Sequence, residues 1–280
     1  MVHLGKADRR RRLTSAVMTS LTAGCTLLAV GLLLVILSYI AWQGIGSLSF
    51  TFLVDSPRPV GEGGGIGNAI LGSVVLLALS SAFGLPLGIS VGIYLSEIGK
   101  GRFADAIRFL VDTLTGIPSI VTGVFVYAIL VLPMRHFSAF AGGVSLALIM
   151  IPIVARTTEE MLKLVPHSLR EGALALGAPQ WRVILGVVLP AAASGIATGA
   201  MLAIARVSGE TAPLLFTAFG SRFFSYYLDR PISSLTVQIY NYAISPYDEW
   251  HAQAWAATLV LMTLILGINI IVRFLTRKRF

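Results

Sequence analysis

Six long apolar stretches dominate the pattern of hydrophobic and polar positions along the chain. They cover residues 16–42, 69–95, 113–134, 137–155, 183–205 and 252–272. Each approaches or exceeds the roughly 20 residues that a helix needs to cross a hydrocarbon core of about 30 Å. Backbone groups surrounded by lipid must find their hydrogen-bond partners within the same segment, which favours helices. The pattern therefore predicts an all-α polytopic membrane protein with six transmembrane helices.

The composition excludes other classes of protein. Hydrophobic residues make up 56% of the 280 residues and charged residues only 12%, whereas soluble domains carry about 25% charged residues. A soluble enzyme and a disordered chain are both excluded. The single cysteine, Cys25, cannot form a disulfide within the chain, and the four histidines lack a metal-binding partner at helical spacing. We expect no catalytic residues and no metal site.

The distribution of basic residues predicts the orientation. A net charge of +8 would indicate nucleic acid in a soluble protein, but in a membrane protein it reflects the Lys and Arg excess of cytoplasmic loops. Six spans put both termini on one side, and all but five of the 21 Lys and Arg residues fall there. The exceptions are Arg58, Arg135, Arg206, Arg222 and Arg230. We therefore expect a multi-pass protein of the plasma (inner) membrane with both termini in the cytoplasm, in contact with the lipid bilayer and not with nucleic acid.

The same pattern divides the chain into four parts. We expect a basic cytoplasmic tail at 1–15, a first transmembrane helix with its outer loop at 16–67, a core at 68–275 and a second basic tail at 276–280. The first apolar stretch is about 26 residues long, longer than the apolar region of a signal peptide, so we expect it to be retained.

Residues 168–177 predict a short helix outside the membrane. Ser168 and Glu171 have the spacing of a capping box, in which each side chain satisfies a free N–H at the helix start. Gly177 stands where a helix end favours glycine, and Pro179 prevents continuation. A helix of about nine residues is marginal in water by itself. Its small apolar face suits docking into a groove of a partner protein, and an interfacial helix on lipid is the alternative.

Residues 206–219 predict a broken helix. Arg206 and Glu210 are four residues apart, so on a helix they would share a face. Arg206 follows Pro190 by 16 residues, or roughly 24 Å of helix, which places it in the middle or outer part of the membrane. The apolar piece at 212–219 is too short to span and suits a re-entrant segment. An ionisable residue there is a functional candidate. The alternatives are a purely structural ion pair at a helix break and a solvated pair at the outer rim.

Two sets of motifs resemble known permeases. The order Glu171-Gly-Ala-x3-Gly177-x9-Val187-x-Leu-Pro resembles the EAA loop of binding-protein-dependent ABC permeases, with Gly172 in place of Ala and Val187 in place of Ile. Residues 209–215 (Gly-Glu-Thr-Ala-Pro-Leu-Leu), 116–123 and 64–70 resemble segments of the phosphate permeases of ABC importers.

This resemblance implies a type I ABC importer permease fold and a subunit that translocates inorganic phosphate. It implies three kinds of protein partner: a second homologous permease subunit, an ATPase subunit dimer and an external phosphate-binding protein. ATP hydrolysis would belong to the ATPase, with no cofactor on this chain. Coupling to the ATPase would use the 168–177 helix, through Ser168, Glu171, Ala173 and Gly177.

The resemblance also assigns a substrate path. The planar fork of an arginine matches an oxyanion, and hydroxyl groups donate to its oxygens. The expected path residues are Arg206, Glu210, Thr211, Ser208, Ser119 and Thr122. Each hydroxyl could instead bond back to a helix carbonyl, and Pro118 and Pro213 could break helices near a gate. By contrast, Gly84-x3-Gly88-x3-Gly92 predicts close helix packing.

Three other functions are open at this point. They are a permease for another oxyanion such as molybdate or sulfate, a stand-alone proton-coupled carrier that uses Glu210, and a membrane enzyme. The glycine-rich 61–65 segment lacks the Gly-Lys-Ser/Thr of a P-loop, so this motif provides no ATP site.

Overall fold

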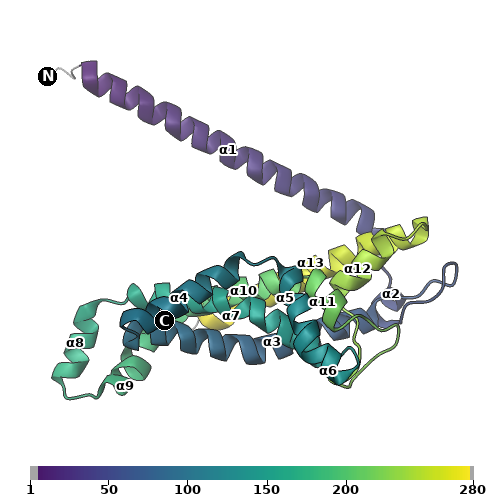
Figure 1. The fold of residues 1–280 in the computed structure, drawn as a ribbon. Helices are drawn as coiled ribbons and strands as arrows, with labels where there is room; N and C mark the ends of the chain where they lie inside the picture. The colour runs from purple at the N-terminus through teal and green to yellow at the C-terminus, as the bar shows by residue number, and fades with distance from the viewer. Residues whose placement is uncertain (1–5, 278–280) are drawn as a thin grey trace.

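The computed structural model describes residues 6–277 and is built from helices (Figure 1). The predicted all-α class is confirmed: within these residues, the strand-like contact is one isolated bridge between Pro57 and Gly64. The first half of the chain forms α1 (Lys6–Ile45), α2 (Phe50–Val54), α3 (Gly67–Ile93) with its π-helical continuation η1 (Tyr94–Ile98), α4 (Gly101–Gly116), α5 (Ser119–Val126), η2 (Tyr127–Val131) and α6 (Leu132–Met134).

The second half carries the remaining long helices and the short helices between them. These are α7 (Ala139–Lys163), α8 (His167–Ala175), α9 (Gln180–Val183), η3 (Ile184–Val188), α10 (Leu189–Ser208), α11 (Ala212–Thr217), α12 (Leu235–Ala243) and α13 (Asp248–Arg277). Residues 1–5 and 278–280 of the two expected basic tails lie outside the described part, and α1 already includes Lys6 to Ser15.

Five helical stretches are long and apolar enough to cross a membrane, and a bent helix pair brings the number to six when it counts as one span. The expectation of one continuous third helix over 113–134 is wrong. The chain bends by 105° between α4 and α5, on either side of Ile117 and Pro118. Proline lacks an N–H and disfavours helical backbone in the preceding residue, so α4 ends at Gly116 and a new helix begins at Ser119.

The helices α3 and α7 form the centre of the bundle. Their closest approach follows the glycine stripe: a Cβ added at Gly84 would lie 2.9 Å from the sulfur of Met150, and one at Gly88 would lie 2.7 Å from the Cβ of Val154. One turn further on, Gly92 faces Thr158 in the same way. The predicted packing role of the three glycines is therefore confirmed.

The two ends of the bundle differ. One end, the α8 end, carries α8, α9 and the C-terminal end of α13, and the other, the α12 end, carries α2 and α12 (Figure 1). The helix α1 diverges from the bundle and meets it near the α12 end, where Gly44 packs against Trp255 and Leu259 of α13. Most of the side chains of α1 are exposed.

Candidate functional site

The break between α10 and α11 differs from the expected geometry. The helix α10 ends at Ser208, and Gly209 and Glu210 lie beyond it. The expectation that Arg206 and Glu210 share a helical face is therefore wrong, and among the described residues no ion pair joins them. The backbone carbonyl of Glu210 instead accepts a 2.9 Å hydrogen bond from the hydroxyl of Thr236. Arg206 is exposed and Glu210 half-buried, so both side chains remain available to another group.

The two predicted path segments lie against each other. The helices α5 and α11 are packed so closely that a Cβ at Gly123 would lie 2.6 Å from the Cα of Pro213. This contact brings the α5 segment with Ser119 and Thr122 beside the start of α11, which follows Thr211 directly. The sequence separates these segments by about 90 residues, and the fold joins them.

The hydroxyl groups of the predicted path differ in whether they already donate a hydrogen bond. Ser208 donates a 2.7 Å hydrogen bond to the carbonyl of Ala205, one turn back along α10. This is the local bond that serine commonly makes inside a membrane helix, and it occupies the hydroxyl proton. Within the described part of the chain, Ser119, Thr122 and Thr211 have no side-chain hydrogen bond, so these three are free to donate.

The helix α8 begins differently from the prediction. Its N-cap is Pro166, and no side chain caps it. The predicted capping box of Ser168 and Glu171 is therefore wrong: the extended backbone of Pro166 starts the helix at His167, which places Ser168 inside the first turn. A serine there is already helical and cannot serve as the cap.

The end of α8 agrees with the prediction. Gly177 adopts a left-handed backbone with φ of +80°. Its N–H donates to the carbonyl of Leu174 at 2.9 Å, and the N–H of Ala178 donates to the carbonyl of Ala173 at 3.3 Å. These two bonds form a Schellman motif, which favours glycine because a Cβ is strained at positive φ.

The surface of α8 and the adjoining turn is open and apolar. Leu169 and Leu174 are exposed, and Leu176 is 90% exposed. Trp181, at the start of α9, is also exposed and stacks with the guanidinium of Arg182. A cluster of exposed apolar side chains on a helix this short indicates an interaction surface.

A bidentate ion pair fixes α8 to the rest of the bundle. Arg170 donates from Nη2 and Nε to the two carboxylate oxygens of Glu97 in η1, at 2.7 and 3.1 Å. Its Nη1 and Nη2 also donate to the carbonyls of Val165 and Leu162, beside the end of α7, at 2.6 and 2.9 Å. The hydrogen bond with Glu97 raises the pKa of Arg170 above its ordinary value, so the guanidinium stays charged. Through this one side chain, α8, η1 and the end of α7 are joined.

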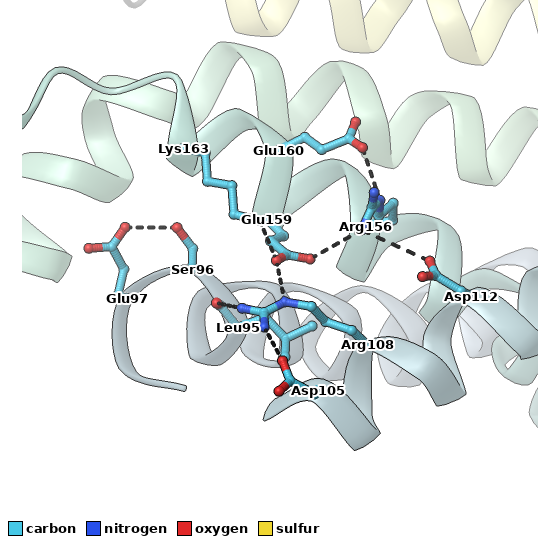
Figure 2. Close-up of polar contacts among 10 residues, drawn as sticks. All are labelled: Leu95, Ser96, Glu97, Asp105, Arg108, Asp112, Arg156, Glu159, Glu160 and Lys163. Atoms are coloured by element: carbon cyan, nitrogen blue, oxygen red, sulfur yellow. Dashed lines mark hydrogen bonds and ion pairs between the residues drawn. The ribbon is translucent and has the colours of Figure 1, made fainter. Parts of the chain in front are cut away.

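A second buried charge cluster lies beside this pair, and the sequence analysis missed it (Figure 2). The side chain of Glu159 on α7 is only 1% exposed and accepts bonds from Lys163 at 2.6 Å and from Arg108 at 2.9 Å. Arg108 also donates to the carbonyl of Leu95 in η1, at 2.8 Å. Arg156 is 3.7 Å from the other oxygen of Glu159. The cluster ties α4 to η1 and α7.

One local signal could have revealed the cluster. Arg156 and Glu159 are three residues apart and Glu159 and Lys163 four, which are the spacings of ion pairs on a helix. The partner that makes the site, Arg108, lies 51 residues away, and no local pattern connects it to Glu159.

The chain is similar to known proteins both in sequence and in fold. The profile of the family described as "Binding-protein-dependent transport system inner membrane component" matches residues 84–280. A relative from Yersinia pestis named "Phosphate transport system permease protein PstA" is 50% identical over 239 residues, which cover 85% of this chain and 81% of the relative. A relative of the same name from Haemophilus influenzae is 47% identical over 232 residues, which cover 82% of each chain.

A solved structure has the same architecture. The structure described as "Inward facing conformations of the MetNI methionine ABC transporter: CY5 native crystal form" superposes with a TM-score of 0.67 at 20% identity, covering 77% of this chain and 96% of that chain. At this identity the likeness concerns the fold alone, and it confirms the predicted type I ABC importer permease fold.

Proposed function

The chain belongs to the family of binding-protein-dependent transport system inner membrane components, and from this premise we propose that it is the permease subunit of an ATP-driven importer of inorganic phosphate. The observation that carries the proposal is the 50% identity to a phosphate permease over 85% of the chain. The packing of the 116–123 segment against the 209–215 segment supports it, because these are the segments that resemble phosphate permeases.

The partners follow from the family and from the exposed surfaces. A second, homologous permease completes the path, an ATPase dimer supplies the energy, and an external phosphate-binding protein delivers the substrate. This chain acts as the transport component, with ATP hydrolysis on the partner. The helix α8 docks into the ATPase, and its exposed leucines and Schellman-closed end support that role.

We propose that α8 and both termini lie in the cytoplasm. The distribution of Lys and Arg supports it. In a Cys25→Ser chain, a cysteine at Glu62 should react with an impermeant thiol reagent added to intact cells, and a cysteine at Leu174 should react only after the membrane is opened. Labelling of the Leu174 position in intact cells would reverse this orientation.

The substrate path is proposed to run past Arg206, with Thr211, Ser119 and Thr122 as hydroxyl donors. The exposed guanidinium and the three unengaged hydroxyls support it. Glu210 lies beyond the end of α10 and is half-buried, and we include it among the path residues because of its position between Arg206 and Thr211.

Uptake of labelled phosphate tests the function. The tagged chain is expressed with its partner subunits in cells that lack other phosphate carriers. The proteins that copurify with it are then identified. We expect phosphate uptake that unlabelled sulfate and molybdate do not inhibit, together with recovery of one ATPase and one further permease. Inhibition by molybdate or sulfate at equal concentration, or purification of the chain alone with activity, would reject the proposal.

Substitution of Arg206 tests the path. Arg206→Lys keeps the charge but loses the planar fork, so uptake should fall strongly. The double substitution Arg206→Ala with Glu210→Ala removes both charges. Near-normal uptake by the double variant, with normal ATPase recovery, would remove Arg206 from the path.

A further inference from the structure

A cavity of about 380 Å³ opens at the α12 end of the bundle, away from the predicted path residues. It lies between the loop after α2, the loop after α11, α12 and the start of α13. Its polar lining includes Arg58, Arg222, Gln238, Asn241, Tyr242 and Trp250. A water molecule occupies about 30 Å³ of liquid, so the cavity has room for a small polyatomic ion and part of its hydration shell.

The charges at this cavity have one sign. Two guanidinium groups line it, and no carboxylate is among the lining residues that the structure describes. Arg58 pairs with Asp55 at 3.0 Å, whereas Arg222 has no ion pair or hydrogen bond within the described residues. Glu249, which precedes Trp250 in the chain, accepts a 2.8 Å bond from the backbone N–H of Gly61. Arg222 is exposed and has no ionic partner among the described residues.

The ring of Trp250 forms part of the cavity wall. It is fixed by aromatic neighbours, with centroids 5.3 Å from Tyr242 and 5.6 Å from Tyr247. Its indole Nε1 is buried, so this N–H is not exposed to the cavity. Burial raises the pKa of Tyr242, so its phenol stays neutral and adds no negative charge.

The loops that present the two arginines are held in place. Asn68 on α3 donates a 2.6 Å bond to the carbonyl of Ser221, next to Arg222. Gly64, with φ of +103°, lies so close to Arg58 that a Cβ would be 2.6 Å from its backbone nitrogen. The backbone that carries the two arginines is therefore held by contacts outside the cavity, while the guanidinium groups themselves are exposed.

We propose that this cavity is an entry site for the transported anion, in which Arg58 and Arg222 hold a phosphate ion before it reaches the path. The inference rests on the proposed function, because the α12 end must face the side from which substrate arrives. A tetrahedral oxyanion with one or two charges fits two guanidinium donors. A neutral or cationic solute would leave Arg222 without an ionic partner.

Binding of inorganic phosphate to the purified transporter, without its external binding protein, tests the entry site. Phosphorus NMR line broadening gives the dissociation constant for the unsubstituted complex and for four variants. Arg222→Gln should weaken binding about tenfold and Arg222→Lys less, and Arg58→Gln, which removes a guanidinium that already pairs with Asp55, should weaken it about threefold. Arg135→Gln is the matched control, because Arg135 is exposed at the same end and does not line the cavity.

The comparison with the control decides the result. Equal effects of Arg222→Gln and Arg135→Gln would show that phosphate is attracted only by the general positive charge of this end and not bound at a specific site. That result would overturn the proposal. Absence of phosphate binding by the unsubstituted complex would overturn it as well. If Arg222→Gln fails to assemble with the ATPase, Arg58→Gln decides, and unchanged binding by that variant rejects the site. The proposed function is tested separately from the entry site. If the proposed function is wrong, the unsubstituted transporter shows no phosphate uptake, whatever the binding measurements give.

Discussion

Removing the charge of Glu97 should loosen α8 without touching its exposed surface. In Glu97→Gln, the two charge-assisted bonds from Arg170 become at best one neutral bond, and the guanidinium is left in a site where it is only 16% exposed. Breaking a fully buried pair in this way costs about 3–5 kcal/mol. Because both groups lie at the edge of the bundle, where water reaches part of the pair, we expect about 2 kcal/mol.

This cost translates into a measurable rate. Each 1.4 kcal/mol is a factor of ten in an equilibrium, so local opening of α8 should become roughly 30-fold more frequent. Amide hydrogen exchange over residues 167–178 reports that opening directly. Arg170→Gln should accelerate exchange further, because it also loses the bonds to the carbonyls of Val165 and Leu162. The double variant should cost less than the sum of the two single variants, since no unpaired charge remains.

Lys100→Gln supplies the control. Lys100 is exposed near Glu97 and, within the described residues, has neither an ion pair nor a hydrogen bond from its side chain, so its exchange pattern should match the unsubstituted protein. Exchange in α8 that is equal in Glu97→Gln and Lys100→Gln would refute the reasoning. Strictly additive single and double variants would show that the two residues act separately.

Three further outcomes are expected. Gly177→Asp places a side chain at positive φ, costs about 1–2 kcal/mol in the α8 turn and should reduce recovery of the ATPase in a pull-down; full recovery would contradict this. Gly92→Val forces atoms into α7 and should lower the thermal stability of the purified chain by about 1–3 kcal/mol, whereas Gly267→Val, with open space around it, should do so much less. Glu159→Ala leaves Arg108 without its buried partner and should speed exchange throughout 101–116, and unchanged exchange there would show that α4 is held by apolar contacts alone.

The sequence predicted those features of the fold that depend on neighbouring residues. Apolar stretches predict the spans because a membrane-crossing helix depends only on a continuous run of apolar residues in one segment. The glycine stripe predicted a close-packing face on α3, because small residues at every fourth position lie on one face, but it did not identify α7 as the partner. Gly177 was recognised as a helix end because its conformation is a property of that residue alone.

The errors arose where two local signals competed. Ser168 and Glu171 have the spacing of a capping box, but Pro166 sets an extended backbone earlier and starts the helix first. Arg206 and Glu210 have the spacing of a helix pair, but Gly209 ends α10 between them. In both cases the residue that constrains the backbone decided the outcome, and the side-chain pattern did not.

The polar centres could not be predicted because their members are far apart in sequence. Glu97 and Arg170 are separated by 73 residues, and Arg108 and Glu159 by 51. Each pair forms only after α3 and α7 have packed, so it depends on the tertiary structure. The entry cavity has the same character, since its lining comes from four separate segments.

The glycine stripe has a consequence for the register of α3 and α7. A slide of four residues, about 6 Å, would bring Gly84 opposite Val154 and Gly88 opposite Thr158, so glycines would again face these side chains. The glycines therefore permit close approach but do not by themselves select one alignment. The same slide would carry Glu159 about one turn away from the carbonyl of Leu95, and Arg108 now bonds to both. The buried carboxylate of Glu159 thus contributes to the register of the two central helices.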